Sequence, residues 1–198
     1  MGQRIPLICI VGPSAAGKTH FSHRLAEALK EVGVRILVLA SDDYYRQNWC
    51  PDPVYGFDTI AAIDSEALIG DLQCLQRRSL RQRRRYDMAT RSVSWDPLSA
   101  VWDMVILEGA FGPQILLERM PPDVLIYLEV SLGRRVLRRL RRDTRERGRS
   151  LPVVLEQTFT NMIAGERRFI TPLKQRADVV IRNPRRDLSR VIDLIDQL

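Results

Sequence analysis

The chain has 198 residues, of which 45% are hydrophobic and 28% are charged. This length and balance predict one globular domain over 1–198 and exclude a disordered or collagen-like chain. No apolar run approaches the roughly 18 residues of a membrane-spanning helix, and the first run leads into a glycine loop instead of a signal cleavage site. Three cysteines without a CxxC pair suit a reducing compartment. We therefore expect a cytoplasmic protein with no membrane partner.

Short apolar runs alternate with amphipathic stretches along the chain, which is typical of βαβ units around a parallel sheet. The runs are continuous in Val, Ile and Leu, as strands covered on both faces are. We predict strands near 5–11, 34–40, 101–107, 123–129 and 177–182. We predict helices near 17–32, 64–76, 112–119, 132–147, 152–168 and 187–197. Two stretches break the pattern: 41–63 is expected to be a long functional loop, and the basic stretch 77–95 has room for a short hairpin.

The formal net charge is +7, and only Lys18, Lys30 and Lys174 are lysines among the 31 basic residues. Such a balance favours a polyanionic partner, either a nucleic acid or a small molecule that carries phosphate. An arginine-rich solvated surface without any partner gives the same composition. Charge alone leaves both interpretations open.

The loop after the first predicted strand fits the phosphate-binding pattern GxxxxGK[ST] at every specified position over 12–19. Its glycines let several backbone N–H groups converge on one phosphate, and the following helix adds a positive dipole. Lys18 would place a charge on the β- and γ-phosphates of ATP, and the Thr19 hydroxyl would bind Mg²⁺. A glycine-rich turn without a ligand is the alternative. The nucleotide-binding residues expected here are Gly12, Ser14, Ala15, Ala16, Gly17, Lys18, Thr19 and His20.

Acidic residues follow the second and third predicted strands. Asp42 and Asp43 come after the second strand, and Glu108 comes after the third. In an open α/β sheet, ligands bind beyond the carboxyl ends of the strands, where a carboxylate can hold Mg²⁺ or accept a proton from an attacking hydroxyl. We predict a metal site of Thr19, Asp42 and Glu108, and transfer of phosphate onto a small hydroxyl compound. The alternatives are a helix cap or Asx-turn at Asp42 or Asp43, and a surface position for Glu108.

The stretch 134–149 reads RRVLRRLRRDTRERGR and is more than half arginine. Arginines at helical spacing repel one another, and bound triphosphate is the simplest anion to offset that repulsion. We therefore predict that residues 134–165 form a helical lid that stabilises charge on the transferred phosphate and excludes water. A nucleic-acid-binding helix and a merely solvated helix are the alternatives.

Five segments match the motifs of one known family, and they lie at 41–45, 106–109, 138–149, 169–174 and 177–181. They resemble its D-x-F-Y segment, its strand-end E-G, its lid R-R-x-x-R-D-x-x-E-R-G-R, and its ending F-x-x-P-x-K-x-x-A-D-x-I-I. On these motifs the chain resembles the uridine kinase family of P-loop kinases, which is related to phosphoribulokinase and pantothenate kinase. The resemblance implies a three-layer α/β P-loop kinase fold with a mostly parallel central sheet, an arginine-rich lid and a small acceptor-binding excursion at about 41–95.

The resemblance also implies roles for single residues. Asp42, preferred to Asp43, would take the proton from a 5′-hydroxyl as that oxygen attacks the γ-phosphorus of ATP. Asp58 would bind the ribose hydroxyls, and Arg149 would contact the nucleotide together with Arg147. The catalytic residues implied are Asp42, Lys18, Arg142 and Arg147. The acceptor-binding residues implied are Asp42, Tyr45, Phe57, Asp58, Tyr86, Arg91, Arg139 and Gln157. ATP and Mg²⁺ are the implied cofactors, a nucleoside is the implied partner, and homo-oligomers are frequent in the family.

The sequence departs from the family where the base should bind. Thr59 and Ile60 replace a His-Pro pair, Met88 replaces an aromatic residue, and Arg91 stands in place of a histidine. Arg91 only donates hydrogen bonds, so it suits a carbonyl-rich base, or a carboxylate or phosphate on another acceptor, unless it points to solvent. Uridine or cytidine is the first candidate acceptor. Another alcohol (a sugar phosphate, a vitamin precursor or a modified nucleoside) and a nucleic-acid-binding NTPase are the alternatives.

Overall fold

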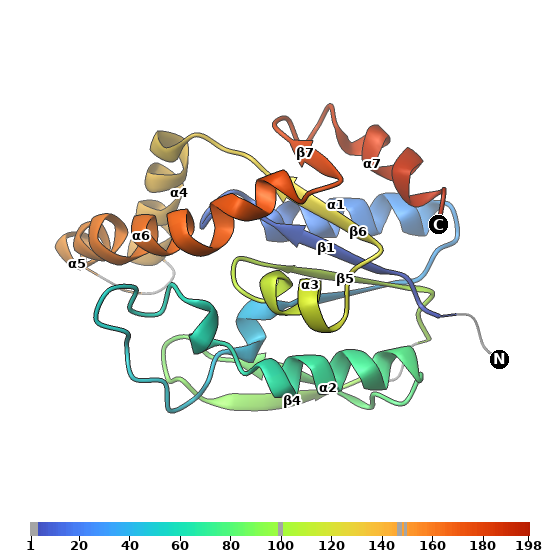
Figure 1. Cartoon of the computed structure of the whole chain (residues 1–198), viewed down its shortest axis with the longest axis horizontal. Coiled ribbons are helices and arrows are strands. Elements are labelled where there is room, and N and C mark those ends of the chain that lie inside the picture. The colour runs from blue at the N-terminus through green and yellow to red at the C-terminus, as the bar shows by residue number, and fades with distance from the viewer. Residues whose placement is uncertain (1–3, 99–100, 146–147, 149) are drawn as a thin grey trace.

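The computed structural model describes residues 4–98, 101–145, 148 and 150–198. Five strands pair in parallel in the order β2-β5-β1-β6-β7 and form the central sheet (Figure 1). Their bounds are β1 Leu7–Val11, β2 Ile36–Ala40, β5 Met104–Gly109, β6 Val124–Leu128 and β7 Val179–Ile181. The expected parallel sheet is confirmed, although β5 starts and ends later than the predicted 101–107.

The helices lie where the amphipathic stretches predict them. Their bounds are α1 Lys18–Glu31, α2 Ser65–Gln76, α3 Pro113–Arg119, α4 Leu132–Arg145, α5 Leu151–Gln157, α6 Ile163–Gly165 and α7 Leu188–Ile195. Two π-helical turns, Thr158–Met162 and Glu166–Ile170, make one continuous helical segment from α5 past α6. Within the described residues, no helix combines the length and apolar content that crossing a membrane requires.

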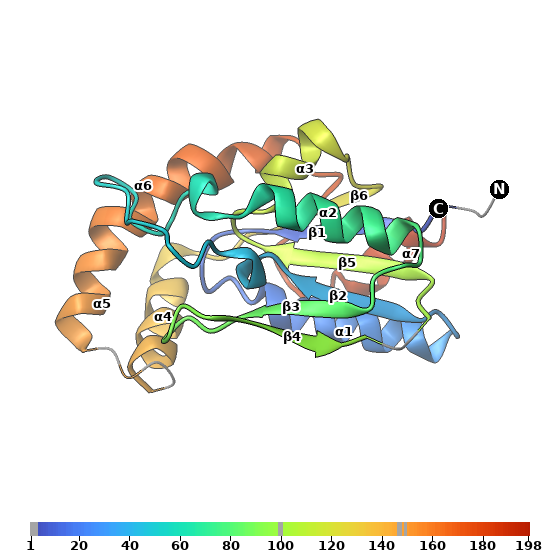
Figure 2. The ribbon, with the colours of Figure 1, turned by 90° about the horizontal axis from the view of Figure 1, so that it is seen from below.

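The sheet is covered on both faces because successive side chains of a strand point to opposite sides. In β1, Leu7 and Cys9 belong to the core layer that α2 and α3 complete, whereas Ile8 and Ile10 belong to the layer that α1 and α7 complete. Figure 2 shows α2 and α3 on one side of the strands and α1 on the other. The result is the three-layer arrangement that the resemblance implied.

The two stretches that break the βαβ pattern lie beside the sheet. Residues 41–63 contain two short 3₁₀ turns, η1 Ser41–Tyr44 and η2 Ile60–Ala62, within an otherwise irregular loop. The basic stretch forms an antiparallel hairpin of β3 Gln82–Tyr86 and β4 Val93–Pro97, which confirms the predicted hairpin. The hairpin therefore lies close to the loop that follows β2, because β3 packs on η1.

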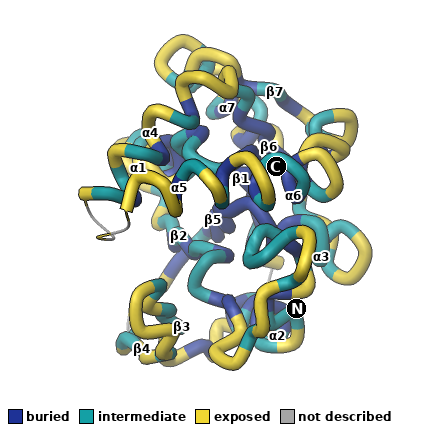
Figure 3. Tube along the Cα trace, turned by 90° about the vertical axis from the view of Figure 1, so that its left-hand side faces the viewer, coloured by how far each residue is buried: buried dark blue, intermediate teal, exposed yellow. Residues whose placement is uncertain are grey.

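All five strands end at one edge of the sheet, as they must when they run in parallel. In Figures 1 and 2 the helices α4, α5 and α6 lie beyond this edge. Figure 3 looks onto the same end, where buried strand segments lie inside a ring of exposed loops and helix turns. The carboxyl edge is where an open α/β sheet binds its ligands, so it is the place to examine for a site.

Candidate active site

The loop over 12–19 joins β1 to α1 at the carboxyl edge. A Cβ atom at Gly12 would lie 2.6 Å from the Leu128 carbonyl oxygen, so only glycine fits where the loop leaves the strand. Ala15 and Gly17 have φ angles of +59° and +93°, which turn the backbone sharply before α1 begins. A turn of this kind at a helix N-terminus provides the backbone of an anion-binding site.

Two side chains at the start of α1 lie close to an acid on the neighbouring strand β5. The Thr19 hydroxyl donates a hydrogen bond of 2.7 Å to Oε1 of Glu108. The Lys18 ammonium donates to the Pro13 carbonyl oxygen at 3.2 Å. Burial raises the pKa of Glu108 to about 6, and the charge of Lys18 opposes that shift. Burial lowers the pKa of Lys18, against the attraction of Glu108 and Asp42.

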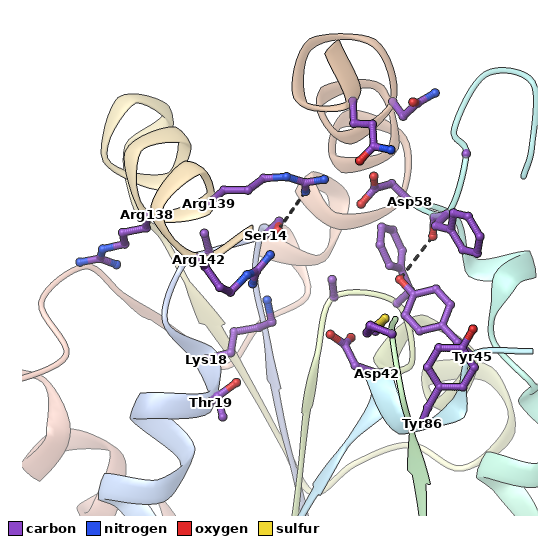
Figure 4. A pocket seen from close by; sticks show the side chains of 18 of the residues that line it. Ser14, Lys18, Thr19, Asp42, Tyr45, Asp58, Tyr86, Arg138, Arg139 and Arg142 are labelled. Carbon is purple, nitrogen blue, oxygen red and sulfur yellow. Dashed lines mark hydrogen bonds between the residues drawn. The ribbon is translucent and has the colours of Figure 1, made fainter. Parts of the chain in front are cut away.

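The two aspartates after β2 have different surroundings. Asp43 accepts hydrogen bonds from the Tyr86 backbone N–H at 3.1 Å and from Nη1 of Arg85 at 3.3 Å, so it anchors the hairpin to η1. Asp42 instead lines the large cavity at the carboxyl edge, together with Lys18. Figure 4 shows the Asp42 carboxylate on the cavity wall across from Lys18. Of the two aspartates, Asp42 is therefore the one that a ligand in the cavity can contact.

Three arginines on one face of α4 contact the phosphate-binding loop. Nη1 of Arg135 donates to the Ser14 carbonyl oxygen at 3.3 Å, and Nη1 of Arg138 donates to the Ala16 carbonyl oxygen at 3.4 Å. Nη1 of Arg139 donates to the Ser14 hydroxyl at 3.3 Å (Figure 4). Because these residues are three and four positions apart, they share one face of the helix. The arginine-rich helix therefore lies against the loop instead of standing free in solvent.

Asp143, to which the sequence analysis gave no role, forms ion pairs with two of the arginines of α4. Asp143 is fully buried within α4. Its carboxylate accepts a hydrogen bond of 2.8 Å from Nε of Arg142 and lies 3.6 Å from Nε of Arg139. An acid within a run of arginines, four residues after Arg139, is the signal that could have identified it. Asp143 keeps the two guanidinium groups beside the loop despite their mutual repulsion.

Glu166 is a second buried acid beside the phosphate-binding loop to which the sequence analysis gave no role. Its Oε1 atom accepts hydrogen bonds from the Ser14 backbone N–H at 3.0 Å and from Nη1 of Arg135 at 2.6 Å. Both charged side chains of this ion pair are less than a tenth exposed. No local pattern marks Glu166, because it is followed by two arginines and resembles a surface acid. Only the packing of the π-helical turn against the loop gives it this contact.

The cavity at the carboxyl edge has a volume of about 870 Å³ and continues past Asp42 into a region lined by aromatic rings. The Tyr45 ring lies 5.8 Å from that of Tyr86 and 6.3 Å from that of Phe57, between ring centroids. The Tyr45 hydroxyl donates to the Phe57 carbonyl oxygen at 3.3 Å (Figure 4). Burial raises the pKa of Asp58 to about 6, although the positive charge of Arg139 opposes the shift.

Most of the predicted site residues come together in this cavity. Those that line it are Ser14, Ala15, Gly17, Lys18, Thr19, His20, Asp42, Tyr45, Phe57, Asp58, Tyr86, Arg91, Glu108, Arg139, Arg142 and Gln157. Gly12 and Ala16 do not line it: Gly12 packs on β6, and the Ala16 side chain is buried in the core. Arg147 and Arg149 lie outside the described residues. Phe111, Val153 and Asn161 also line the cavity and were not predicted.

The raised pKa of Asp58 leads to a prediction about stability. The folded chain holds this proton more tightly than the unfolded chain, so the contribution of Asp58 to stability is greatest at low pH and is lost as pH rises through about 6. We expect Asp58→Asn to raise the free energy of unfolding at pH 7.5 by about 3 kcal/mol and to have no effect below about pH 3. Thermal melts of both proteins across this pH range measure the difference; a destabilised variant at pH 7.5 would contradict it.

The parallel sheet, the glycine loop at the end of β1 and the cavity beyond it place the chain in the class of P-loop kinases. The same fold occurs in a provisionally assigned fructose transport system kinase from Silicibacter sp. TM1040, with a TM-score of 0.73, 19% identity, and 91% of each chain covered. It also occurs in a provisionally assigned uridine kinase from Bacillus stearothermophilus, with a TM-score of 0.63, 20% identity, and 91% and 90% of the two chains covered.

The sequence model of the phosphoribulokinase/uridine kinase family matches residues 7–189. The uridine kinase of Staphylococcus aureus strain JH9 is 33% identical over 184 residues, which cover 88% of this chain and 86% of that protein. The chain belongs to the phosphoribulokinase/uridine kinase family. The family expectation from the sequence motifs is thereby confirmed, and so is kinase activity as the general class of function.

Proposed function

We propose that this protein transfers the γ-phosphate of ATP to the 5′-hydroxyl of a nucleoside, with uridine and cytidine as the first candidates. One observation carries the proposal: Asp42 lies on the wall of the cavity that also contains Lys18 and Thr19 of the phosphate loop. A carboxylate across from such a loop is where a base for an attacking hydroxyl is needed. The name of the Staphylococcus relative supports the choice of nucleoside.

The residues of the loop fit a magnesium–nucleotide complex. Thr19 and Glu108 bring a hydroxyl and a carboxylate oxygen within 2.7 Å of each other, and both are oxygen donors that Mg²⁺ prefers. Asp42 lines the same cavity and completes the proposed set. Among the described residues no group of three or more His, Cys, Asp or Glu could enclose a metal ion. We infer that Mg²⁺, when bound, takes its other oxygens from the phosphates and water and neutralises developing charge there.

In the proposed reaction, Asp42 accepts the proton of the 5′-hydroxyl. The hydroxyl oxygen forms a bond to the γ-phosphorus, and the bond from that phosphorus to the bridging oxygen of ADP breaks. Lys18, Arg139 and Arg142 supply the positive charge that stabilises the transferred phosphate. In this proposal α4 and α5 act as a lid that excludes water. Arg147 and Arg149, to which the resemblance gives roles beside the nucleotide, lie outside the described residues.

The rest of the cavity is proposed to bind the nucleoside. Asp58 would accept hydrogen bonds from both ribose hydroxyls, since one carboxylate can accept from two neighbouring donors. Tyr45, Phe57 and Tyr86 supply a wall of rings against which a flat base can pack. Gln157 lies on the same cavity and can both donate and accept hydrogen bonds.

A second candidate is a related kinase that acts on another alcohol, such as a sugar phosphate, a vitamin precursor or a modified nucleoside. Arg91 favours it, because a guanidinium on the cavity wall would suit an acidic acceptor as well. A nucleic-acid-binding NTPase is less well supported, since the arginines of β3 pair with acids of this chain: Arg83 and Arg85 with Asp96, and Arg84 with Asp64. The cytoplasmic location and a homo-oligomeric state remain predictions.

An acceptor panel tests the proposal. Purified protein with ATP and Mg²⁺ should consume ATP in the presence of uridine or cytidine, and 5′-deoxyuridine should not be phosphorylated because it lacks the attacking oxygen. RNA and DNA should leave ATP consumption unchanged. Consumption only with a sugar phosphate or a hydroxy acid would favour the second candidate. Consumption stimulated by RNA and steeply reduced by salt would favour the NTPase.

A further inference from the structure

Arg91 is held by the hairpin turn in a backbone conformation that arginine seldom adopts. Oδ1 of Asp87 accepts the backbone N–H groups of Ala89 at 2.7 Å and Thr90 at 3.0 Å, and the Arg91 N–H donates to the Asp87 carbonyl oxygen at 2.8 Å. Arg91 leaves this turn with a φ of +57°. Glycine or asparagine would adopt the left-handed conformation at lower cost. A strained residue on a cavity wall points to a role for its side chain.

The guanidinium of Arg91 lies over the Phe57 ring, with its central carbon 4.7 Å from the ring centroid. Among the described residues, the guanidinium of Arg91 forms no hydrogen bond and no ion pair, and its contact is this stacking on Phe57. The neighbouring Arg85, in contrast, pairs with both Asp43 and Asp96. Arg91 is an exposed residue on the cavity wall, so its N–H donors face solvent and are available to a ligand in the aromatic part of the cavity.

We infer that Arg91 donates hydrogen bonds to a carbonyl oxygen of the acceptor's base and makes this kinase select 4-oxo over 4-amino pyrimidines. The inference rests on the proposed function. With the ribose bound between Asp42 and Asp58, the exocyclic group at C4 lies opposite the sugar and reaches farthest along the cavity. Uridine presents an acceptor there, whereas cytidine presents an amino group. The amino group of cytidine and the guanidinium of Arg91 would both present N–H donors to each other, so neither group would have an acceptor.

An acidic acceptor fits the same part of the cavity less well. The positive side chains of the cavity lie mainly on the phosphate loop and α4, where the nucleotide is proposed to bind, and Asp58 lies on the acceptor side of the cavity. The region around Arg91 is formed by Phe57, Tyr86 and the partly buried Met88, which suit a flat ring better than a hydrated carboxylate or phosphate. A neutral carbonyl satisfies the guanidinium without adding charge.

The test compares kcat/KM for uridine and cytidine in three proteins: the wild type, Arg91→Gln and Arg81→Gln. We expect the wild type to prefer uridine by roughly 10-fold, which is the net worth of one hydrogen bond from a charged group that is exposed when no ligand is bound. Glutamine can both donate and accept, so Arg91→Gln should reduce the preference to about threefold or less. Arg81 is exposed on the same hairpin and does not line the cavity, so Arg81→Gln should keep the wild-type preference. Equal thermal melts establish that the variants are folded.

A second readout is binding, measured by calorimetry with a non-hydrolysable ATP analogue present. Tighter binding of uridine than of cytidine, lost in Arg91→Gln, supports the inference. Equal use of both nucleosides by the wild type, or an unchanged preference in Arg91→Gln, overturns it while the proposed function stands. Phosphorylation of neither nucleoside overturns the proposed function itself. If the wild type phosphorylates D-glycerate or ribose 5-phosphate and Arg91→Gln does not, then Arg91 binds an acidic acceptor instead and the inference is overturned.

Discussion

Asp42→Asn should lower kcat by about 10²–10⁴-fold and leave the affinity for ATP nearly unchanged. The amide keeps the shape of the carboxylate but cannot take the proton of the attacking hydroxyl. Asp42 lies across the cavity from the phosphate loop, and asparagine keeps one oxygen donor toward Mg²⁺, so binding of the nucleotide should survive. Initial rates at saturating ATP and acceptor measure kcat, and calorimetry measures ATP affinity.

Two other variants serve as comparisons for the effect of Asp42→Asn. Asp43→Asn is the matched control, because Asp43 has the same chemistry one residue away but accepts its hydrogen bonds from the hairpin. Its kcat should stay within a few-fold of the wild type. Lys18→Ala should weaken ATP binding and transfer together, since Lys18 lies on the loop itself. Full turnover of Asp42→Asn would show that another group, or water alone, takes the proton.

Gly165→Ala should lower kcat/KM for the acceptor by about 100-fold, because a displacement of roughly 1 Å in a site can cost that much. A Cβ atom at Gly165 would lie 2.1 Å from the Asp58 carbonyl oxygen and 3.0 Å from the Asp58 Cβ. The backbone of Asp58 must therefore move away from the helix, and it carries the acid proposed to bind ribose. The same clash should reduce the free energy of unfolding by about 1–3 kcal/mol.

Gly70→Ala is the control for helix propensity. Gly70 lies inside α2, and a Cβ atom there meets no atom within 4 Å. This variant should keep its acceptor kinetics and gain about 0.5–1 kcal/mol of stability, because alanine restricts the unfolded chain. Kinetics with varied acceptor and urea denaturation of both variants measure the effects. Wild-type kcat/KM in Gly165→Ala would show that the close approach of Asp58 to the helix is not needed.

Local signals predicted the sheet, its flanking helices and the phosphate loop. The strands could be predicted because five short runs of Val, Ile and Leu indicate strands that are covered on both faces. The loop could be predicted because its glycine, lysine and threonine residues have a fixed spacing. The prediction for β5 was early because Val101 and Trp102 extend the apolar run, although pairing with β2 begins at Met104 and pairing with β1 begins at Val105. Apolar character shows that a segment is buried, whereas hydrogen bonding to a neighbour decides where a strand begins.

The sequence by itself determined the class of this protein, because the residues that curl a loop around phosphate are consecutive and their chemistry is local. The tertiary structure decided where the acidic side chains point. It turned Asp42 to the cavity and Asp43 to the hairpin, and it buried Glu166 between Arg135 and the loop. The motif at 41–45 already favours Asp42 over Asp43, but the contacts themselves join segments far apart in the chain, which local spacing does not specify.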